Sequence, residues 1–191
     1  MMKVAFVIFD EMTALDFVGV YDPVTRLKSM NLMPQLSWDL CAFTPQVADD
    51  RGLAFTPTKV REPLRDYDLL IVPGGFGTRA LVDDAPFIAW LRTAASCELK
   101  ASVCTGSLLL GAAGFLSGRR ATTHPNAFRE LGRFCGKVVE DQRVVDEGDV
   151  VTAGGVTAAI DLGLHLVGRL AGREGRERIR KQMDYRAAGT T

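Results

Sequence analysis

The 191-residue sequence has no excess of charge of either sign, because 23 Lys and Arg residues balance 23 Asp and Glu residues. Proteins that bind nucleic acid or an anionic membrane surface usually carry a block or patch of basic residues, and this sequence has no block of like charge. It also lacks any uncharged apolar run of about eighteen residues, so it predicts no transmembrane helix. We therefore expect a small molecule or another protein as the partner, with no nucleic acid and no membrane.

A signal peptide and a cysteine framework are missing as well. Asp10 and Glu11 follow the short apolar run at the N-terminus, and no small-residue cleavage site follows it. The four cysteines form no CxxC pair, which argues against a zinc site and against a set of disulfides. They are Cys41, Cys97, Cys104 and Cys135. The sequence thus predicts a protein of the reducing cytoplasm with no metal site.

What the sequence does contain is an alternation of short apolar runs with segments of helical periodicity. This alternation predicts one α/β domain over residues 1–191, a three-layer flavodoxin-like doubly wound, mostly parallel sheet with helices on both faces. The strand order that we expect is 2-1-3-4-5. Small hairpins or edge strands are expected in 44–63 and 135–148, and a solvated helix in 173–185. The expected strands are 3–9, 36–43, 68–75, 100–104 and 149–155, and the expected helices are 16–30, 85–97, 105–114, 124–134 and 157–171.

Cys104 stands at the junction of a predicted strand and a predicted helix, in "SVCTGSLLLGAAG". A sharp turn of this kind exposes one side chain above the sheet, as in a nucleophile elbow. The helix N-terminus that follows favours a thiolate over a thiol, so Cys104 is expected to be the most reactive thiol. A buried and inert cysteine is the alternative, since free cysteines are among the most buried residues.

Two other loops are expected to meet Cys104, because the carboxyl ends of neighbouring parallel strands lie at one edge of the sheet. The turn "VPGGFG" brings Gly74 and Gly75, and the N–H groups of Gly75 and Thr105 are candidates for an oxyanion hole. A tight turn that needs φ > 0 is the alternative for the glycines. Asp16 in "TALDFVG" is a candidate acid, or else a helix cap.

Four segments together are similar to the ThiJ/PfpI superfamily, in the class I glutamine-amidotransferase-like fold, and to its isonitrile hydratase-like subgroup. They are "LDFVG" around residue 16, "VPGG" at 72–75, "SVCTGSLLLGAAGFLSGRRATTH" at 102–124 and "TAGGVTAAIDLGLHLV" at 152–167. The resemblance implies that Cys104 is the nucleophile and Asp16 the acid beside it. It further implies that Gly75 and Thr105 bind the oxyanion and that His124 approaches the cysteine.

Two positions depart from other branches of the superfamily. Thr105 stands where protease-like members have His, which disfavours a Cys-His protease or amidase. Pro125 follows "ATTH", whereas the isonitrile hydratase pattern more often has an aromatic residue there. His124 also has an ordinary alternative as a packed or capping residue at a helix start. Asp161 is expected to be structural, and His165 to be a core residue.

The function that these observations favour is hydration of an isonitrile to an N-substituted formamide. Cys104 would attack the isonitrile carbon, and Asp16 would protonate that carbon and then activate water. This chemistry needs no metal or organic cofactor.

One alternative is a non-catalytic sensor, because AraC-type regulators have a similar ligand-binding half. We expect no helix-turn-helix domain here, since the sequence ends at Thr191. A redox sensor or a glyoxalase- or deglycase-like enzyme is another alternative. The resemblance implies a homodimer, the commonest assembly of soluble domains.

Overall fold

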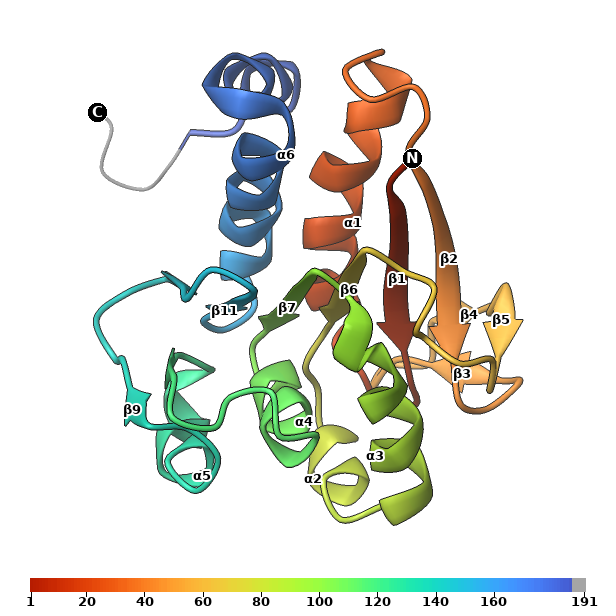
Figure 1. Ribbon diagram of the computed structural model, residues 1–191, viewed down its shortest axis with the longest axis vertical. Coiled ribbons are helices and arrows are strands. Elements are labelled where there is room, and N and C mark those ends of the chain that lie inside the picture. Colours follow the sequence, from red (N-terminus) through yellow and green to blue (C-terminus); the bar gives the residue numbers. More distant parts are fainter. Residues whose placement is uncertain (187–191) are drawn as a thin grey trace.

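The computed structural model describes residues 1–186. Its central feature is a seven-stranded sheet with the order β10-β11-β7-β6-β1-β2-β5 (Figure 1). Neighbouring strands are parallel except for β10 and β11. The strands are β1 (Lys3–Ile8), β2 (Ser37–Ala42), β5 (Lys59–Val60), β6 (Leu69–Val72), β7 (Leu99–Val103), β10 (Val144–Asp146) and β11 (Val150–Ala153).

The flavodoxin-like order is confirmed. The five strands expected from the sequence are β1, β2, β6, β7 and β11, and their spatial order β2-β1-β6-β7-β11 is 2-1-3-4-5. The order of the chain reverses at β1, which pairs with β2 on one side and with β6 on the other. In open α/β sheets a ligand site lies beyond the carboxyl ends of the strands at such a point. The loops after β1 and β6 are therefore the ones to inspect.

Helices cover both faces of the sheet, as Figure 1 shows. On one face α1 and α6 lie side by side, and on the other face α4 contacts both α2 and α3. Glycine permits the close approach of α1 and α6, because a Cβ atom on Gly19 would lie 2.6 Å from Ala159 Cβ. The helices are α1 (Ala14–Ser29), α2 (Thr78–Leu81), α3 (Ala85–Arg92), α4 (Gly106–Ala112), α5 (Phe128–Leu131) and α6 (Ala158–Gln182).

Three of the predicted helices differ from the structure by more than two residues at one end or both. The segment 124–134 is a 3-10 turn, η2 (Pro125–Ala127), followed by the single turn of α5. The segment 85–97 leaves α-helical geometry after Arg92 and ends in η1 (Thr93–Ser96). Helix α6 continues through a kink at Gly172, where φ is 73°. The charged segment at 173–185 is thus the end of α6.

The two segments with weak strand patterns supply edges. In 44–63, β3 (Val47–Ala48) and β4 (Ala54–Phe55) form the expected hairpin, and β5 joins the main sheet beside β2. In 135–148, β9 (Lys137–Val138) pairs with β8 (Arg120–Ala121), and β10 forms the antiparallel edge of the main sheet. Both additions lie outside the five parallel strands, so they leave the predicted order intact.

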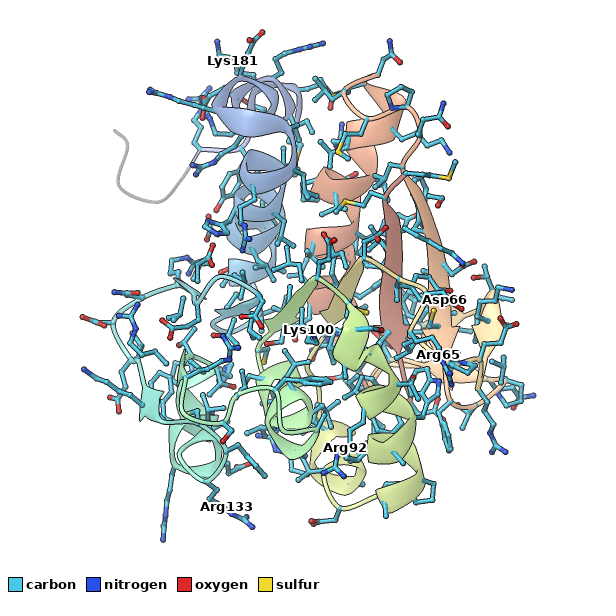
Figure 2. All side chains as sticks on the ribbon, in the orientation of Figure 1. Arg65, Asp66, Arg92, Lys100, Arg133 and Lys181 are labelled. Carbon is cyan, nitrogen blue, oxygen red and sulfur yellow. The ribbon has the colours of Figure 1, made fainter. Side chains whose placement is uncertain are left out.

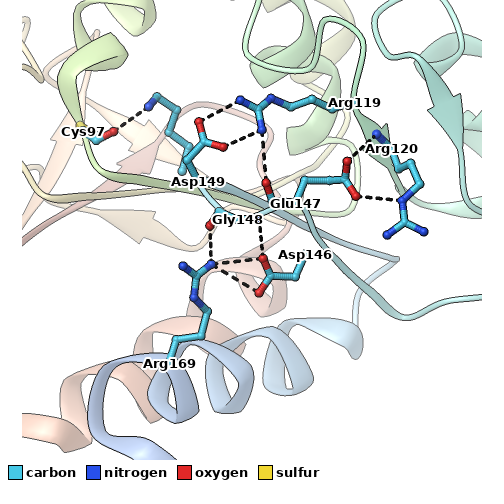
Figure 3. Close-up of polar contacts among 9 residues, drawn as sticks. Cys97, Arg119, Arg120, Asp146, Glu147, Gly148, Asp149 and Arg169 are labelled. Atoms are coloured by element: carbon cyan, nitrogen blue, oxygen red, sulfur yellow. Dashed lines mark hydrogen bonds and ion pairs between the residues drawn. The ribbon is translucent and has the colours of Figure 1, made fainter.

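Ion pairs surround the end of the edge strand β10 and the turn that joins it to β11 (Figure 3). The Arg119 guanidinium donates two hydrogen bonds to the Asp149 carboxylate, at 2.6 and 2.9 Å. Arg169 Nη1 lies 3.2 Å from Asp146 Oδ1, and Arg120 Nε lies 2.8 Å from Glu147 Oε1. Charged side chains at an edge strand discourage pairing with another chain. Half-exposed pairs of this kind each contribute about 0.2–1 kcal/mol.

The core lies on both sides of the central strands. All residues of β6 and β7 are buried, as expected for parallel strands covered on two faces. Lys100 in β7 is among them, and burial lowers its pKa. Its Nζ donates to the Cys97 carbonyl oxygen at 2.7 Å. In Figure 2, Lys181 and Arg133 point outward at two ends of the molecule, whereas Lys100 lies in the interior of the view.

Candidate functional site

The three loops that were expected to meet do lie together. Asp16 is in the first turn of α1, after β1, and its Oδ2 accepts a hydrogen bond from the Gly74 N–H at 3.0 Å, after β6. The next amide, Gly75 N–H, donates to Thr105 Oγ1 at 3.0 Å, after β7. These contacts join residues far apart in the sequence at the carboxyl ends of β1, β6 and β7. The site therefore forms at the switch point of the sheet.

Cys104 has the strained backbone of an elbow, with φ at 53°, which is uncommon for a residue other than glycine. Its N–H donates to the carbonyl oxygens of Ala153 (3.0 Å) and Gly154 (3.1 Å) in and after β11. The turn also needs a glycine at 106, because a Cβ atom there would lie 2.5 Å from the Pro73 carbonyl oxygen. The surrounding hydrogen bonds and close packing thus impose the strain on Cys104.

The Cys104 side chain is more enclosed than the elbow pattern suggested, with 6% of the residue exposed. Its carbonyl oxygen accepts from Thr123 Oγ1 at 2.8 Å and from Ser107 Oγ at 3.1 Å. The residue therefore sits in a fixed backbone frame with the sulfur at the bottom of a cavity. The expectation of an exposed thiol is wrong in this respect.

Asp16 does not act as a helix cap. The residue before α1 is Thr13, so Asp16 is the third residue of the helix, and its side chain points into the site and accepts from Gly74. The carboxyl is fully buried, and its Oδ1 makes no hydrogen bond of good geometry within residues 1–186. The Cys104 thiol is the neighbouring side chain within hydrogen-bonding reach. Asp16 and Cys104 therefore form a buried pair.

Burial raises the pKa of Asp16 from 3.8 to about 7, and the negative charge of Asp50 adds to this shift. The hydrogen bonds of Gly74 N–H and of Cys104 act in the opposite direction, but they do not outweigh burial. Within residues 1–186, no positive charge offsets the burial of this carboxyl. Asp16 is thus poised to gain or lose a proton near neutral pH.

Burial also raises the pKa of Cys104 to about 12, with the charge of Asp16 as the second cause. The Thr105 N–H lowers this pKa, but by less. The expected stabilisation of a free thiolate by the helix N-terminus is therefore wrong for the resting site. Helix α4 has only seven residues, and its first amide competes with a buried carboxylate next to the sulfur. Because each group influences the pKa of the other, the two pKa values describe the Cys104–Asp16 pair as a unit.

The predicted oxyanion donors differ in availability. Gly75 N–H is already bound to the Thr105 hydroxyl, which also approaches the Gly75 carbonyl oxygen at 3.2 Å. Gly75 has φ at 140°, and a Cβ atom there would lie 2.5 Å from Met12 Cα. The tight turn therefore requires glycine at this position, as the alternative interpretation expected. The Thr105 N–H, in contrast, lies beside the sulfur. The Thr105 N–H remains the candidate oxyanion donor, and Gly75 positions the Thr105 hydroxyl.

His124 lines the same cavity as Cys104 and also has a local role. Its Nδ1 accepts from the Asn126 N–H at 3.2 Å at the start of η2, as the capping alternative expected. The ring lies against Gly155, where there is no room for a Cβ atom. No hydrogen bond joins His124 to Cys104 among the described residues. His124 therefore forms a wall of the cavity.

The cavity above Cys104 has a volume of about 420 Å³. The lining residues that were not singled out from the sequence include Asp50, Arg51, Phe76 and Arg79. The first two come from the β3–β4 hairpin, which is held to the site by the hydrogen bond from Asp50 N–H to the Met12 carbonyl oxygen (3.2 Å). No local pattern signals this contact. The cavity is lined by Thr13, Leu15, Asp50, Arg51, Gly75, Phe76, Arg79, Cys104, Thr105, His124, Asn126 and Val156.

The other cysteines lack such a setting. Cys41 and Cys97 are buried, and burial raises the pKa of each thiol to about 11. Cys135 is half-buried, and neither it nor the other two lines the cavity. In residues 1–186, no group of three His, Cys, Asp or Glu side chains is placed to hold a metal ion. Within the same range, no helix is long and apolar enough to span a membrane.

Two residues near the C-terminus lie outside the site. Asp161 accepts hydrogen bonds from Arg143 Nε at 2.6 Å and from the Tyr185 hydroxyl at 2.7 Å, consistent with a structural role. His165 was expected in the core, but it is half-exposed, and its Nε2 lies 2.6 Å from Asp146 Oδ2. The helical spacing placed it next to the apolar stripe of α6, at the margin facing β10.

Residues 2–169 match the DJ-1/PfpI family. The chain belongs to this family. Among its curated relatives, the isonitrile hydratase of Pseudomonas putida is 36% identical over 189 residues, which cover 98% of this chain and 80% of that protein. The family also contains regulators: the HTH-type transcriptional regulator GbdR of Pseudomonas aeruginosa is 26% identical over 195 residues. That match covers 96% of this chain and 53% of GbdR, so the chain spans about half the length of the regulator.

Solved structures of the family have the same architecture. A ThiJ/PfpI family protein from Pseudomonas syringae superimposes with a TM-score of 0.87 at 32% identity, covering 100% of this chain and 77% of that one. DJ-1beta of Drosophila melanogaster has a TM-score of 0.82 at 23% identity, covering 97% and 100%. The second similarity concerns the fold alone. The prediction of the superfamily is thus confirmed, while the roles of the individual site residues remain predictions.

Proposed function

We propose that this protein is a cysteine-dependent hydratase that converts an isonitrile to an N-substituted formamide, with Cys104 as nucleophile and Asp16 as its proton partner. The observation that carries the proposal is the buried Cys104–Asp16 pair, in which a carboxyl with a pKa of about 7 adjoins a thiol under a cavity of about 420 Å³. The similarity to the isonitrile hydratase of Pseudomonas putida supports the same chemistry.

In the first half of the reaction the sulfur of Cys104 bonds to the isonitrile carbon. The thiol proton passes to the Asp16 carboxylate, and the Asp16 carboxyl returns that proton to the carbon, which gives a thioimidate, Cys–S–CH=N–R. A proton acceptor with a pKa near 7 suits both transfers, because it neither holds nor releases the proton too strongly. The Thr105 N–H is placed to stabilise negative charge as sulfur is deprotonated.

In the second half, water adds to the thioimidate carbon. Asp16 takes one proton of this water and delivers it to the nitrogen. The tetrahedral intermediate then collapses as the C–S bond breaks, and the hydroxyl proton returns through Asp16 to the sulfur. The product R–NH–CHO leaves, and both residues regain their starting states. Asp16 thus serves as acid and base at different steps.

The direct test is to incubate the reduced protein with a small alkyl isonitrile and to quantify the formamide by chromatography. We expect turnover above the buffer rate and none in Cys104→Ala. Formamide at the buffer rate, with the thiol shown to be reduced, would overturn the hydratase proposal.

A ligand or redox sensor is the second candidate. It is favoured by the similarity of nearly the whole chain to one half of GbdR and by the protonated, enclosed state of Cys104. A sensor binds its ligand or is oxidised without releasing a product. Saturable binding of an isonitrile without formamide release, or oxidation of Cys104 in preference to the other thiols, would favour this function. A product from glyoxal would indicate the glyoxalase-like alternative.

We also propose a homodimer. Leu15 and Val18, on α1, are 44% and 43% exposed, which leaves an apolar face next to the cavity for a second copy. Light scattering is expected to give about twice the chain mass of 20.8 kDa. A monomer at micromolar concentration would contradict this assembly.

A further inference from the structure

Two arginines line the cavity that contains Cys104, and neither is fully engaged. Arg79 Nε lies 3.6 Å from Glu130 Oε2, beyond good hydrogen-bond distance, and its Nη1 lies 3.4 Å from the Gly75 carbonyl oxygen. Arg51 Nη1 lies 3.4 Å from Asp50 Oδ1 and makes no well-aligned hydrogen bond to it. Both guanidinium groups therefore keep donors for a ligand at the mouth of the cavity.

Among the residues that line this cavity, positive charges outnumber negative ones. Within residues 1–186, Asp50 is the one carboxylate lining the cavity, and it adjoins Arg51. Glu130 contacts Arg79 from outside the cavity lining. The lining thus has two positive groups and one negative group, and Asp16 below them is protonated for part of the time at neutral pH. An incoming group with one negative charge meets an attractive surface.

We propose that the substrate's N-substituent carries a carboxylate, which Arg79 binds with Arg51 as a second contact. This inference deepens the proposed hydratase function, on which its substrate class rests. The planar guanidinium fork matches a carboxylate in two parallel hydrogen bonds. A phosphate monoester is less favourable, because its second negative charge would face Asp50. Phe76, which is 70% exposed at the rim, offers an apolar surface for the carbon atoms between the isonitrile group and the carboxylate.

The first test compares two isonitriles with the same reacting centre, isocyanoacetate and its methyl ester. We expect kcat/KM of the parent to favour the carboxylate, chiefly through KM. Arg79→Gln is expected to lower the ratio of kcat/KM for the carboxylate to kcat/KM for the ester roughly fivefold, the effect of one half-exposed ion pair. Arg79→Lys keeps the charge and restores part of the preference. The preference also falls at high salt.

The matched control is Arg65→Gln, an exposed arginine just before β6, at the opposite end of this strand from Gly74. It removes the same charge without touching the cavity, so the carboxylate-to-ester ratio is expected to stay constant. An equal fall of the ratio in both variants would mean that net charge alone is responsible, and it would overturn the role of Arg79.

A second test needs no hydratase activity. Iodoacetate and iodoacetamide alkylate a thiol at the same carbon, and only the first carries a carboxylate. We expect the ratio of their rates at Cys104, relative to the ratio for free cysteine, to be raised in the parent and to fall roughly fivefold in Arg79→Gln.

The two tests separate the two proposals. If no isonitrile is hydrated but the alkylation ratio depends on Arg79, the hydratase function is wrong and the carboxylate preference stands for another electrophile. If the ester is hydrated but neither ratio changes in Arg79→Gln, the hydratase function stands and the carboxylate-binding role is wrong.

Discussion

Asp16 and Asp146 are two carboxyl groups at the ends of the same sheet, and their surroundings shift their pKa values in opposite directions. Asp16 is fully buried beside a thiol, and burial raises its pKa to about 7. Burial acts on Asp146 too, but the His165 hydrogen bond, the Gly148 N–H and the Arg169 charge together lower its pKa. A carboxyl without a cation becomes a proton carrier, whereas one with cations becomes a fixed anion.

The largest expected effect concerns the thiol next to Asp16. Cys104→Ala removes the nucleophile and is expected to reduce isonitrile turnover by roughly 10³-fold or more, because within residues 1–186 no other thiol lines the cavity. Formamide production checks this. Cys135→Ala, a half-buried thiol outside the cavity, is the control and is expected to retain activity. Residual turnover of Cys104→Ala near the parent rate would rule out covalent catalysis by this residue.

The second-largest expected effect concerns the proton that Asp16 transfers. Asp16→Asn keeps an oxygen that accepts the Gly74 N–H but cannot carry a proton between sulfur and carbon. Isonitrile turnover is expected to fall by roughly 10²–10⁴-fold, the usual loss when a general acid–base group is removed. Circular dichroism is expected to show an unchanged fold. Turnover close to the parent rate would return Asp16 to a purely structural role.

The same variant is expected to gain stability while it loses activity. The folded-state pKa of Asp16 is about 7, above its unfolded value of 3.8, so ionisation favours the unfolded chain as the pH rises between these values. Asp16→Asn and the parent are therefore expected to be similarly stable near pH 4. At pH 8 the free energy of unfolding of the variant is expected to exceed that of the parent by up to about 4 kcal/mol. Urea unfolding at both pH values measures this difference, and a variant that is weaker at pH 8 would contradict the account.

Asp146→Asn is expected to behave in the reverse way, with a smaller effect. The lowered pKa of Asp146 means that its ionised form stabilises the fold at neutral pH and that this contribution is lost as the pH falls through the folded-state pKa. The loss at pH 7 is expected to be about 1 kcal/mol, because the contact is partly exposed to solvent. A loss that persists undiminished in acid would point to packing instead of charge.

The sequence predicted the large features of this molecule better than the state of its site. Apolar runs such as those of β6 and β7 are local, so they determine the strands, and the βαβ connections then restrict the strand order. The meeting of Asp16, Gly74 and Cys104 follows from that order. The direction of the Cys104 pKa shift does not, because it depends on how closely a distant carboxyl and the surrounding side chains enclose the sulfur.

The walls of the cavity were not predictable for a related reason. Asp50 and Arg51 belong to a short hairpin whose β pattern is weak, and backbone hydrogen bonds to Glu11 and Met12 bring them to the site. His165 shows a smaller error of the same origin, since helical spacing defines a stripe but not where the stripe meets the sheet edge. Contacts between distant segments carry no signal in either segment alone.

The central claim, that Cys104 and Asp16 share a proton for catalysis, is tested most directly by comparing alkylation with turnover in Asp16→Asn. The charge of Asp16 raises the pKa of Cys104, so its removal increases the thiolate fraction. The account predicts that iodoacetamide alkylates Cys104 of Asp16→Asn faster than Cys104 of the parent at pH 8, while isonitrile turnover falls by at least about 10²-fold. Slower alkylation together with retained turnover would contradict it.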